Sequence, residues 1–457
     1  MKRILGLLLV VSSFSAAAQE IPVLLALHGS NTVGQKLAPA LALAWAKTEG
    51  WEVVADKAPV ANERVIELRR DAESAQITIA AHGTSTGLGA LIEYRADLWM
   101  ASRVVLPEEV RAHAAAIGRL DDPTQEHVIA LDGLAIIVHP SSRLTALTLD
   151  QIDAIFQGKI SDWSAMGQAA GAIHLYARDD KSGTFDTFKS LVLRGAALAP
   201  QALRFESTDA LASAVANDPN AIGFVGLAGV GKARTVAVSD RETRAMLPAA
   251  LSISTEDYLL SRRLLLYSTN APREEVKRFI EFAQSSEGQS LVNKVGFVGQ
   301  GIGLYKTERI VEGPGEYREL TLGAERLSVN LRFGNGRSYL DSKAMRDLDR
   351  IAAFLRPYQR GAQEIILIGF SDRLEHNPVL ALHMSNDRAD FVATALAQRG
   401  VPVHRSRGLG QNLAVAGNDS DGGRSKNRRV EIWVRPKSAN AIAAQRSATS
   451  APSRAGS

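Results

Sequence analysis

Short apolar runs alternate with helical patterns along residues 22–305, and this alternation constrains the fold of the chain more than any other feature. Four runs have the length and composition of strands: Val23 to Leu27, Gln76 to Ala80, Leu134 to Val138 and Ala221 to Val225. Leu37, Leu41 and Trp45 repeat at the spacing of one helix face. The pattern predicts an α/β domain with mostly parallel strands. Because about 280 residues exceed one hydrophobic core, two lobes are expected.

A second, smaller α/β unit is expected over residues 325–436. Three of its segments have the composition of strands: Leu327 to Phe333, Glu364 to Ile368 and Val430 to Val434. Asp341 and Ser342 can cap a helix, because short polar side chains accept hydrogen bonds from the first helical N–H groups. This helix would carry four apolar residues on one face: Met345, Leu348, Ala352 and Leu355. Ser385 is predicted to cap a second helix that runs through Ala397.

The segments that flank these units differ from them in composition. Residues 306–324 are polar and rich in turn residues, which predicts a linker. Residues 437–457 are rich in Ala and Ser without periodicity, which predicts a disordered tail. Residues 1–18 combine two cations, a short apolar run and a final Ala-Ala-Ala, the pattern of a cleavable signal peptide. The first domain of the exported protein would then span residues 19–305.

Charge is spread along the chain rather than concentrated. The formal net charge is +4 over 457 residues, and no basic run is interleaved with aromatics, so nucleic acid is not an expected partner. One charged segment, Glu63 to Asp71, interleaves acidic and basic residues, which is typical of a solvated helix face.

The residue types that most chemistry requires are absent or scattered. The chain has no cysteine, which excludes disulfides, thiolate metal sites and a lipid anchor. Its nine histidines form no His-x-x-His or His-Glu-x-x-His pattern, so neither a metal nor a cofactor is expected. Ser182-Gly183-Thr184 lacks the Gly-x-Ser-x-Gly pattern of a hydrolase. The sequence therefore predicts a binding protein rather than an enzyme, located in a bacterial periplasm.

The segment Ala177 to Phe185 has the composition of an anion site. A helix that begins at Ser182-Gly183-Thr184 leaves its first N–H groups unpaired, and these groups bind anions together with the helix dipole. Arg178 would add a forked donor that fits a tetrahedral oxyanion. Two other strand-to-helix turns, at residues 28–34 and 81–89, also carry hydroxyls and small residues. Three such turns at the carboxyl ends of strands can converge on one dehydrated anion.

Over residues 20–305 the chain resembles the periplasmic phosphate-binding proteins of ABC importers. The resemblance rests on an ordered set of motifs: Gly29 to Gly34, Gly83 to Gly87, Ala96 to Arg103, Asp132 to Ala135, Leu149 to Ile152, Ile155 to Trp163, Arg178 with Ser182 to Thr184, and Ala221 to Val225. It implies a type 2 periplasmic binding fold, with two lobes joined by crossing strands and inorganic phosphate held in the cleft. It also implies an ABC importer permease as a partner.

The same resemblance implies which residues contact phosphate. By position in the motifs they are eight: Thr32, Val33, Thr84, Ser102, Arg178, Ser182, Gly183 and Thr184. Ser102 stands where some members of the family have an aspartate, which accepts the proton that phosphate carries and sulfate lacks. Selectivity for phosphate over sulfate would then depend on another acceptor, and Asp179 or Asp180 is the candidate. Sulfate or another tetrahedral oxyanion therefore stays open as the ligand.

Over residues 325–436 the chain resembles the OmpA-like peptidoglycan-binding domains, which are small α/β sandwiches. The matching segments are Leu331 to Phe333 with Leu340, Ile366 to Asp372, Met384 to Ala389, Gly408 to Gln411 and Gly423 to Ile432. By resemblance, Asp372 meets the ammonium of the diaminopimelate in a stem peptide, Arg388 meets its carboxylate, and Arg429 supports them. The sequence departs from the family in lacking a glycine at residues 373–376.

Together these inferences predict an exported receptor that binds phosphate and is tethered to the peptidoglycan, in the periplasm or beside the outer membrane. Uptake and sensing are both compatible with this prediction. Two alternatives belong to other classes: a periplasmic enzyme that acts on phosphate esters, and a structural or adhesive envelope protein whose cleft binds nothing.

Overall fold

The computed structural model describes residues 21–437, apart from residues 181, 242, 308–312, 335–338, 360–362 and 374–376. The predicted signal peptide and residues 438–457 of the predicted tail lie outside the described residues. Within the described part of the chain, no helix has both the length and the apolar composition to cross a membrane. The strands form two sheets, one in the N-terminal region and one in the C-terminal region.

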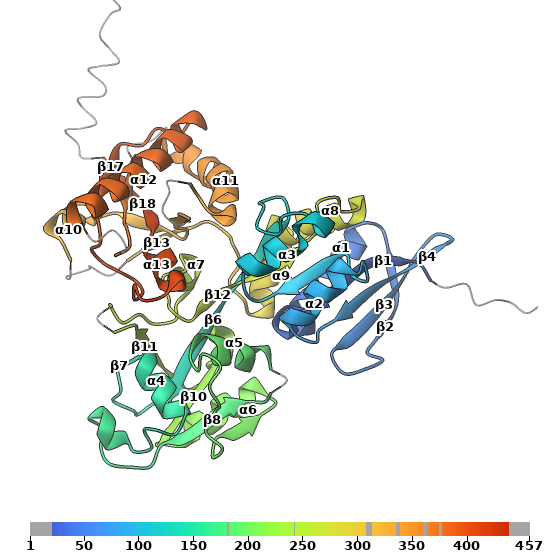
Figure 1. The fold of residues 1–457 in the computed structure, drawn as a ribbon, viewed down its shortest axis with the longest axis horizontal. Helices are drawn as coiled ribbons and strands as arrows, with labels where there is room; N and C mark the ends of the chain where they lie inside the picture. The colour runs from blue at the N-terminus through green and yellow to red at the C-terminus, as the bar shows by residue number, and fades with distance from the viewer. Residues whose placement is uncertain are drawn as a thin grey trace, which may run out of the picture.

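Lobe 1 is built on five strands that lie in the order β2-β3-β4-β1-β5 (blue in Figure 1). These strands are β1 (Val23–Gly29), β2 (Glu52–Lys57), β3 (Glu63–Arg70), β4 (Glu73–Ala80) and β5 (Leu98–Ala101). Its helices are a π-helical turn (Val33–Leu37), α1 (Ala38–Thr48), α2 (Thr84–Ile92), α3 (Pro107–Ile117), α8 (Glu274–Gln284) and α9 (Ser286–Val295). A core that includes Leu27, Leu41 and Trp45 joins this sheet to α1 and α8.

Lobe 2 (green in Figure 1) holds the strands that follow in the chain. They are β7 (Ala146–Thr148), β8 (His174–Arg178), β9 (Leu203–Phe205), β10 (Ala221–Gly226) and β11 (Arg234–Ser239). Its longer helices are α4 (Leu149–Phe156), α5 (Gly183–Leu191) and α6 (Thr208–Asn217), and the short α7 (Ala250–Ser254) follows. Phe156, Phe188 and Phe224 pack ring against ring between α4, α5 and β10.

Two strands, β6 (Glu126–Val138) and β12 (Ser261–Tyr267), connect the lobes. The first half of β6 pairs with β12, which also pairs with β5 of lobe 1. The second half of β6 pairs with β10 and β11 of lobe 2. All thirteen residues of β6 are buried, as expected for a strand covered on both faces. The prediction of two lobes joined by crossing strands is therefore confirmed.

Two details of this region differ from the sequence-based expectations. The sheet is mixed rather than mostly parallel, because β6 pairs antiparallel with β10, β11 and β12. Residues 63–70 form strand β3 and not a helix face. Ile66 and Leu68 alternate with the charged residues and are buried, so the relevant period is two and the charged side chains lie on the other face.

The second domain (orange and red in Figure 1) has a sheet with the order β13-β14-β18-β16-β17, and β15 also pairs with β18. Its strands are β13 (Leu304–Lys306), β14 (Glu325–Leu327), β15 (Leu331–Arg332), β16 (Gln363–Gly369), β17 (Arg405–Gly408) and β18 (Arg429–Pro436). Its helices are α10 (Gly315–Thr321), α11 (Ser342–Gln359), α12 (Pro378–Gln398) and α13 (Asp421–Asn427). α11 and α12 pack their apolar residues against one another and against β16.

Three expectations for this domain are corrected by the structure. The segment predicted as a linker contains α10, whose Tyr317 is buried beside Trp433, so this helix is packed on the sheet. The predicted strand from Leu327 to Phe333 is broken into β14 and β15. Ser385 lies inside α12, whose cap is the Asn377 side chain, which accepts a hydrogen bond from the N–H of Val379 at 2.9 Å.

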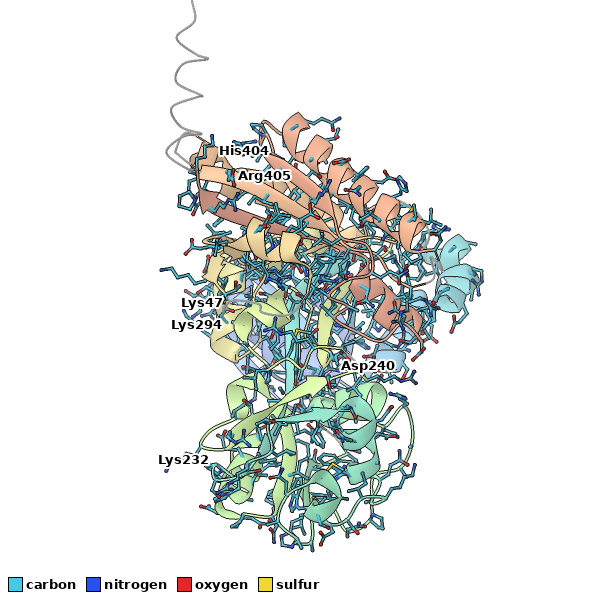
Figure 2. The ribbon with its side chains drawn as sticks, turned by 90° about the vertical axis from the view of Figure 1, so that its left-hand side faces the viewer. Lys47, Lys232, Asp240, Lys294, His404 and Arg405 are labelled. Atoms are coloured by element: carbon cyan, nitrogen blue, oxygen red, sulfur yellow. The ribbon has the colours of Figure 1, made fainter. Side chains whose placement is uncertain are left out.

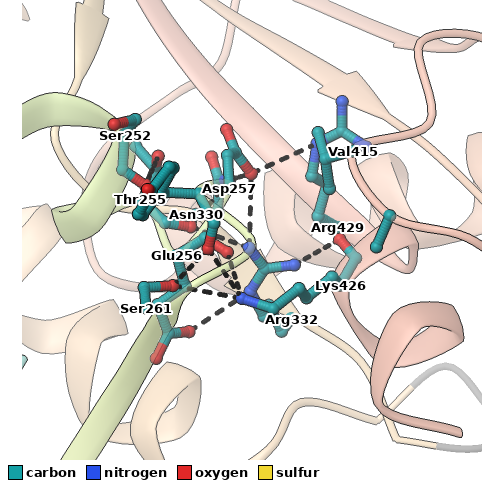
Figure 3. A network of polar contacts seen from close by, with 12 residues as sticks. Ser252, Thr255, Glu256, Asp257, Ser261, Asn330, Arg332, Val415, Lys426 and Arg429 are labelled. Atoms are coloured by element: carbon teal, nitrogen blue, oxygen red, sulfur yellow. Dashed lines mark hydrogen bonds and ion pairs between the residues drawn. The ribbon is translucent and has the colours of Figure 1, made fainter. Parts of the chain in front are cut away.

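The second domain packs against the hinge and both lobes. Ser342 donates to Glu126 at the lobe 1 end of β6. The N–H of Gly417 donates to Asp240 of lobe 2 at 2.7 Å, and Figure 2 shows Asp240 at the edge of lobe 2 nearest this domain. Between them, Glu256 and Asp257 of the turn before β12 form a buried polar network with the second domain (Figure 3).

Candidate functional site: the interlobe cleft

A cavity of about 620 Å³ lies between the two lobes. Five of the eight predicted phosphate contacts line it: Thr32, Arg178, Ser182, Gly183 and Thr184. They come from the turn after β1 in lobe 1, the end of β8 and the start of α5 in lobe 2. The carboxyl ends of strands from both lobes therefore face the same cavity, as open α/β sheets generally arrange their ligand sites.

The start of α5 is held by its own side chains. Ser182 is the N-cap, and its hydroxyl accepts a hydrogen bond from the N–H of Thr184 at 3.2 Å. Gly183 follows and lies against lobe 1, since a Cβ there would lie 2.0 Å from the Thr32 hydroxyl oxygen. Only glycine allows this approach. The positive end of α5 therefore lies directly opposite Thr32 across the cleft.

Arg178 is fixed by lobe 2. Its Nε donates to the carbonyl of Phe205 at 3.2 Å, Nη1 to the Thr208 hydroxyl at 2.5 Å and Nη2 to the carbonyl of Glu206 at 2.7 Å. An arginine has five N–H groups, so two remain without a bond to the described residues. Partial burial lowers the pKa of Arg178, opposed by Asp179 and Glu206, and the guanidinium keeps its charge.

The remaining three predicted contacts are arranged differently. The Thr84 and Ser102 hydroxyls lie 3.1 Å apart and pair with each other. Ser102 lines a neighbouring cavity, which is shared with the second domain, rather than the cleft that holds Arg178. The Val33 side chain is fully buried in the core of lobe 1. In this conformation the structure thus brings five of the eight residues together and leaves Val33, Thr84 and Ser102 outside the lining.

Carboxylates also line the cleft. Asp179 is part of the lining, together with Asp132, Glu206 and Asp209. Asp180 instead forms an ion pair with Arg204 at 2.5 Å, and its side chain is 86% exposed. Of the two candidate acceptors, Asp179 is therefore the one that reaches the cleft. Within the residues that the structure describes, no group of three or more His, Asp or Glu could hold a metal ion.

Arg262 of β12 is a residue that the sequence analysis did not single out. Arg262 lines the neighbouring cavity that is shared with the second domain, and its guanidinium pairs with Asp132 at 3.2 Å and donates to the Thr32 hydroxyl at 2.7 Å. It also donates to the carbonyl of Gly183 at 3.0 Å. The signal in the sequence is a pair of arginines inside the run Leu259 to Leu266, which otherwise holds five leucines and Ser261.

The candidate peptidoglycan residues of the second domain lie around the end of β16 and are almost fully buried. Asp372 is 3% exposed and forms an ion pair with Arg428 at 2.5 Å. Arg388 donates to the carbonyl of Phe370 at 3.2 Å. Arg429 stacks over the Phe370 ring and pairs with Glu431 at 3.0 Å. The pairing of Asp372 with Arg428 was not foreseen.

The fold and the cleft together define a class: a two-lobed ligand-binding protein with crossing hinge strands, followed by a small α/β domain. Comparison with known proteins then gives the family. Residues 57–287, half of the 457-residue chain, match the PBP superfamily domain, and the chain belongs to that superfamily. Residues 332–428 match the OmpA family, so the second domain is an OmpA domain.

The similar proteins share the first domain. The phosphate-binding protein PstS of Borreliella burgdorferi is 24% identical over 249 residues, which is 53% of this chain and 86% of that protein. PstS of Pseudomonas aeruginosa is 29% identical over 250 residues, 51% of this chain and 76% of that protein. A crystal structure described as a possible phosphate-binding protein from Planctomyces limnophilus aligns with a TM-score of 0.50 and 25% identity, over 62% of this chain and 94% of that one.

Proposed function

We propose that this protein is a periplasmic receptor that binds inorganic phosphate between its two lobes and carries out no chemical reaction. It would deliver phosphate to the permease of an ABC importer or report the phosphate level. The observation that carries the proposal is the cleft in which Arg178 and the start of α5 face Thr32. The phosphate-binding relatives support the same ligand.

The donors of the cleft suit a small, dehydrated oxyanion. Arg178 keeps two N–H groups for the ligand, and Ser182, Thr184 and Thr32 line the same cavity with their hydroxyls. Charge-assisted hydrogen bonds from a guanidinium are about twice as strong as neutral ones. The N-terminus of α5 adds its dipole on the same side. These groups can replace the hydration shell of phosphate.

The acceptors of the cleft favour phosphate over sulfate. Asp179 lines the cleft, and a carboxylate accepts the hydrogen bond of a protonated phosphate but repels the fully ionised sulfate. Sulfate is the second candidate ligand. Ser102 stands where some family members have an aspartate, and it lies outside the cleft lining, so no carboxylate at this position would repel sulfate. Asp179→Asn is expected to narrow the preference for phosphate, because an amide also donates to sulfate.

Isothermal titration of residues 19–457 with phosphate and with sulfate tests the ligand. We expect saturable phosphate binding, weakened about 100-fold or more in Arg178→Ala, since that change removes two charge-assisted hydrogen bonds. Arg194→Ala is the matched control, because Arg194 is 59% exposed and pairs only with Asp150 in the described part of lobe 2. Sulfate heat without phosphate heat would refute the assignment, and no heat from either would favour a structural envelope protein.

The OmpA domain would tether this receptor to peptidoglycan through the diaminopimelate of stem peptides. Asp372 would hold the ligand ammonium, Arg388 its carboxylate, and Arg429 would support the site. Because Arg428 already pairs with Asp372 at 2.5 Å, the ammonium has to share or replace that partner. Sedimentation with purified sacculi tests the tether. Equal pelleting of Asp372→Ala and the wild type would refute the role of Asp372.

A further inference from the structure

The hinge strand β12 carries charged residues on both of its faces, and successive residues of a strand point to opposite faces. Arg263 points toward the second domain and pairs with Glu256 at 2.5 Å and with Asp341 at 2.7 Å. Arg262, between Ser261 and Arg263, points the other way and reaches the loops that line the cleft. One arginine of the hinge thus contacts two residues that line the candidate anion site.

The Arg262 guanidinium joins the two lobes. Its Nη2 donates to the Thr32 hydroxyl of lobe 1 at 2.7 Å and to the Gly183 carbonyl of lobe 2 at 3.0 Å. Asp132 holds the same guanidinium from strand β6 at 3.2 Å, in register with Arg262 across the two hinge strands. The Arg262 and Asp132 side chains are 8% and 7% exposed, so solvent screens these contacts little.

The hydrogen bond to Thr32 has a directional consequence. A threonine hydroxyl has one hydrogen and two lone pairs. Because Arg262 has no acceptor, the bond between them occupies a lone pair of Thr32 and leaves the hydroxyl hydrogen to point elsewhere. Thr32 lines the cleft, so this hydrogen is available to an anion there.

We propose that Arg262 is a positioning residue for the anion site, which orients the Thr32 hydroxyl as a hydrogen-bond donor and ties Thr32 to Gly183 when the lobes close. The inference rests on the proposed function, since it concerns the same cleft. Arg262 acts through Thr32 and Gly183 and does not itself line the cavity that holds Arg178.

Titration of phosphate into single and double variants of Arg262 and Thr32 tests this role. Arg262→Gln removes the cation, Thr32→Val removes the hydroxyl at nearly constant shape, and the double variant removes both. Each single change is expected to raise the Kd for phosphate about 10- to 100-fold, as for one lost hydrogen bond in a charged network. The double variant should be no weaker than the weaker single variant, because both changes remove the same donor.

Two further variants separate positioning from folding. Arg262→Gln leaves Asp132 buried without its partner. If thermal unfolding shows that this variant does not fold, Asp132→Asn/Arg262→Gln replaces it and is compared with Asp132→Asn, because Asp132 itself lines the cleft. Arg262→Lys keeps a donor for Thr32 and should recover part of the affinity. A purely structural role of Arg262 would not produce both the partial recovery of affinity in Arg262→Lys and the non-additivity between Arg262 and Thr32.

The outcomes are distinct. Phosphate binding by a folded Arg262 variant within twofold of the wild type overturns this inference and leaves the proposed function intact. Full additivity of Arg262→Gln and Thr32→Val also overturns it. Absence of phosphate binding by the wild type overturns the proposed function and the inference with it.

Discussion

Asp257 is expected to be one of the residues that hold the OmpA domain against the two-lobed domain, and Asp257→Asn tests this. Asp257 is 2% exposed and accepts hydrogen bonds from three side chains of the second domain, of which Asn330 and Arg332 are labelled in Figure 3. Arg326 donates at 2.7 Å, Asn330 at 2.8 Å and Arg332 at 3.2 Å. Burial alone would raise the pKa of Asp257, but Arg326, Arg429 and Arg332 outweigh it and lower the pKa.

The magnitude follows from this burial. Removing one partner of a buried ion pair costs about 3–5 kcal/mol, because the other charges are left in a low-dielectric site. Asparagine keeps one acceptor for Asn330 and Arg332 but turns an N–H₂ group toward the arginines. We therefore expect Asp257→Asn to lower the free energy of unfolding by about 3 kcal/mol. Since the folded state lowers the pKa below its ordinary value of 3.8, the contribution is present above that pH and is lost as the pH falls further.

Urea unfolding followed by circular dichroism at pH 7 and pH 3 measures the effect. The control is Asp349→Asn, since Asp349 pairs with Arg399 at 2.7 Å but is 75% exposed, and such pairs contribute less than about 1 kcal/mol. The Asp257 variant should be much less stable than the control at pH 7, and the difference between their free energies of unfolding should be smaller at pH 3. Equal free energies of unfolding for the two variants at pH 7 would refute the reasoning.

Three further predictions address other parts of the molecule. Burial lowers the pKa of Lys426 to about 8. The free energy of unfolding of the wild type relative to Lys426→Met should therefore rise between pH 8 and about 10.5, by up to about 3 kcal/mol. Urea titrations in which this difference does not change with pH would contradict the prediction. Gly183→Ala should weaken phosphate binding at least tenfold, because the added Cβ would lie 2.0 Å from the Thr32 hydroxyl. Wild-type affinity for phosphate in calorimetry would contradict the close approach of Gly183 to Thr32. Asp372→Ala should lower sedimentation with sacculi, whereas Asp387→Ala, on the exposed face of α12, should not.

Local patterns in the sequence were enough for the α/β fold, the two lobes and most of the cleft. Arg178 and the cap at Ser182 are encoded within a few residues of each other, and the structure places both at one cavity. For the charged segment that includes Ile66 and Leu68, the sequence pattern predicts a helix but the structure has a strand. The interleaved acidic and basic residues of this segment also fit a helix face. For α12, Asn377 and Pro378 were the true start signals, and Ser385 was misleading because its hydroxyl serves tertiary contacts, accepting from the N–H of Gly410 at 2.8 Å.

Contacts between residues far apart in the chain could not be predicted in this way. Arg262 reaches Thr32 across 230 residues, and Asn330 reaches Asp257 across 73. Such pairs depend on how the hinge strands cross and on how the second domain docks, which no local periodicity encodes. The same holds for Arg428, which pairs with Asp372 and thereby changes what a ligand ammonium must displace.

Equilibrium dialysis of residues 19–457 against radiolabelled phosphate tests the central claim most directly. We expect that one phosphate is retained per chain and is displaced by unlabelled phosphate in preference to sulfate. Retention of no phosphate by a folded protein, with or without sulfate present, would contradict the proposal that the cleft between the lobes is a phosphate site.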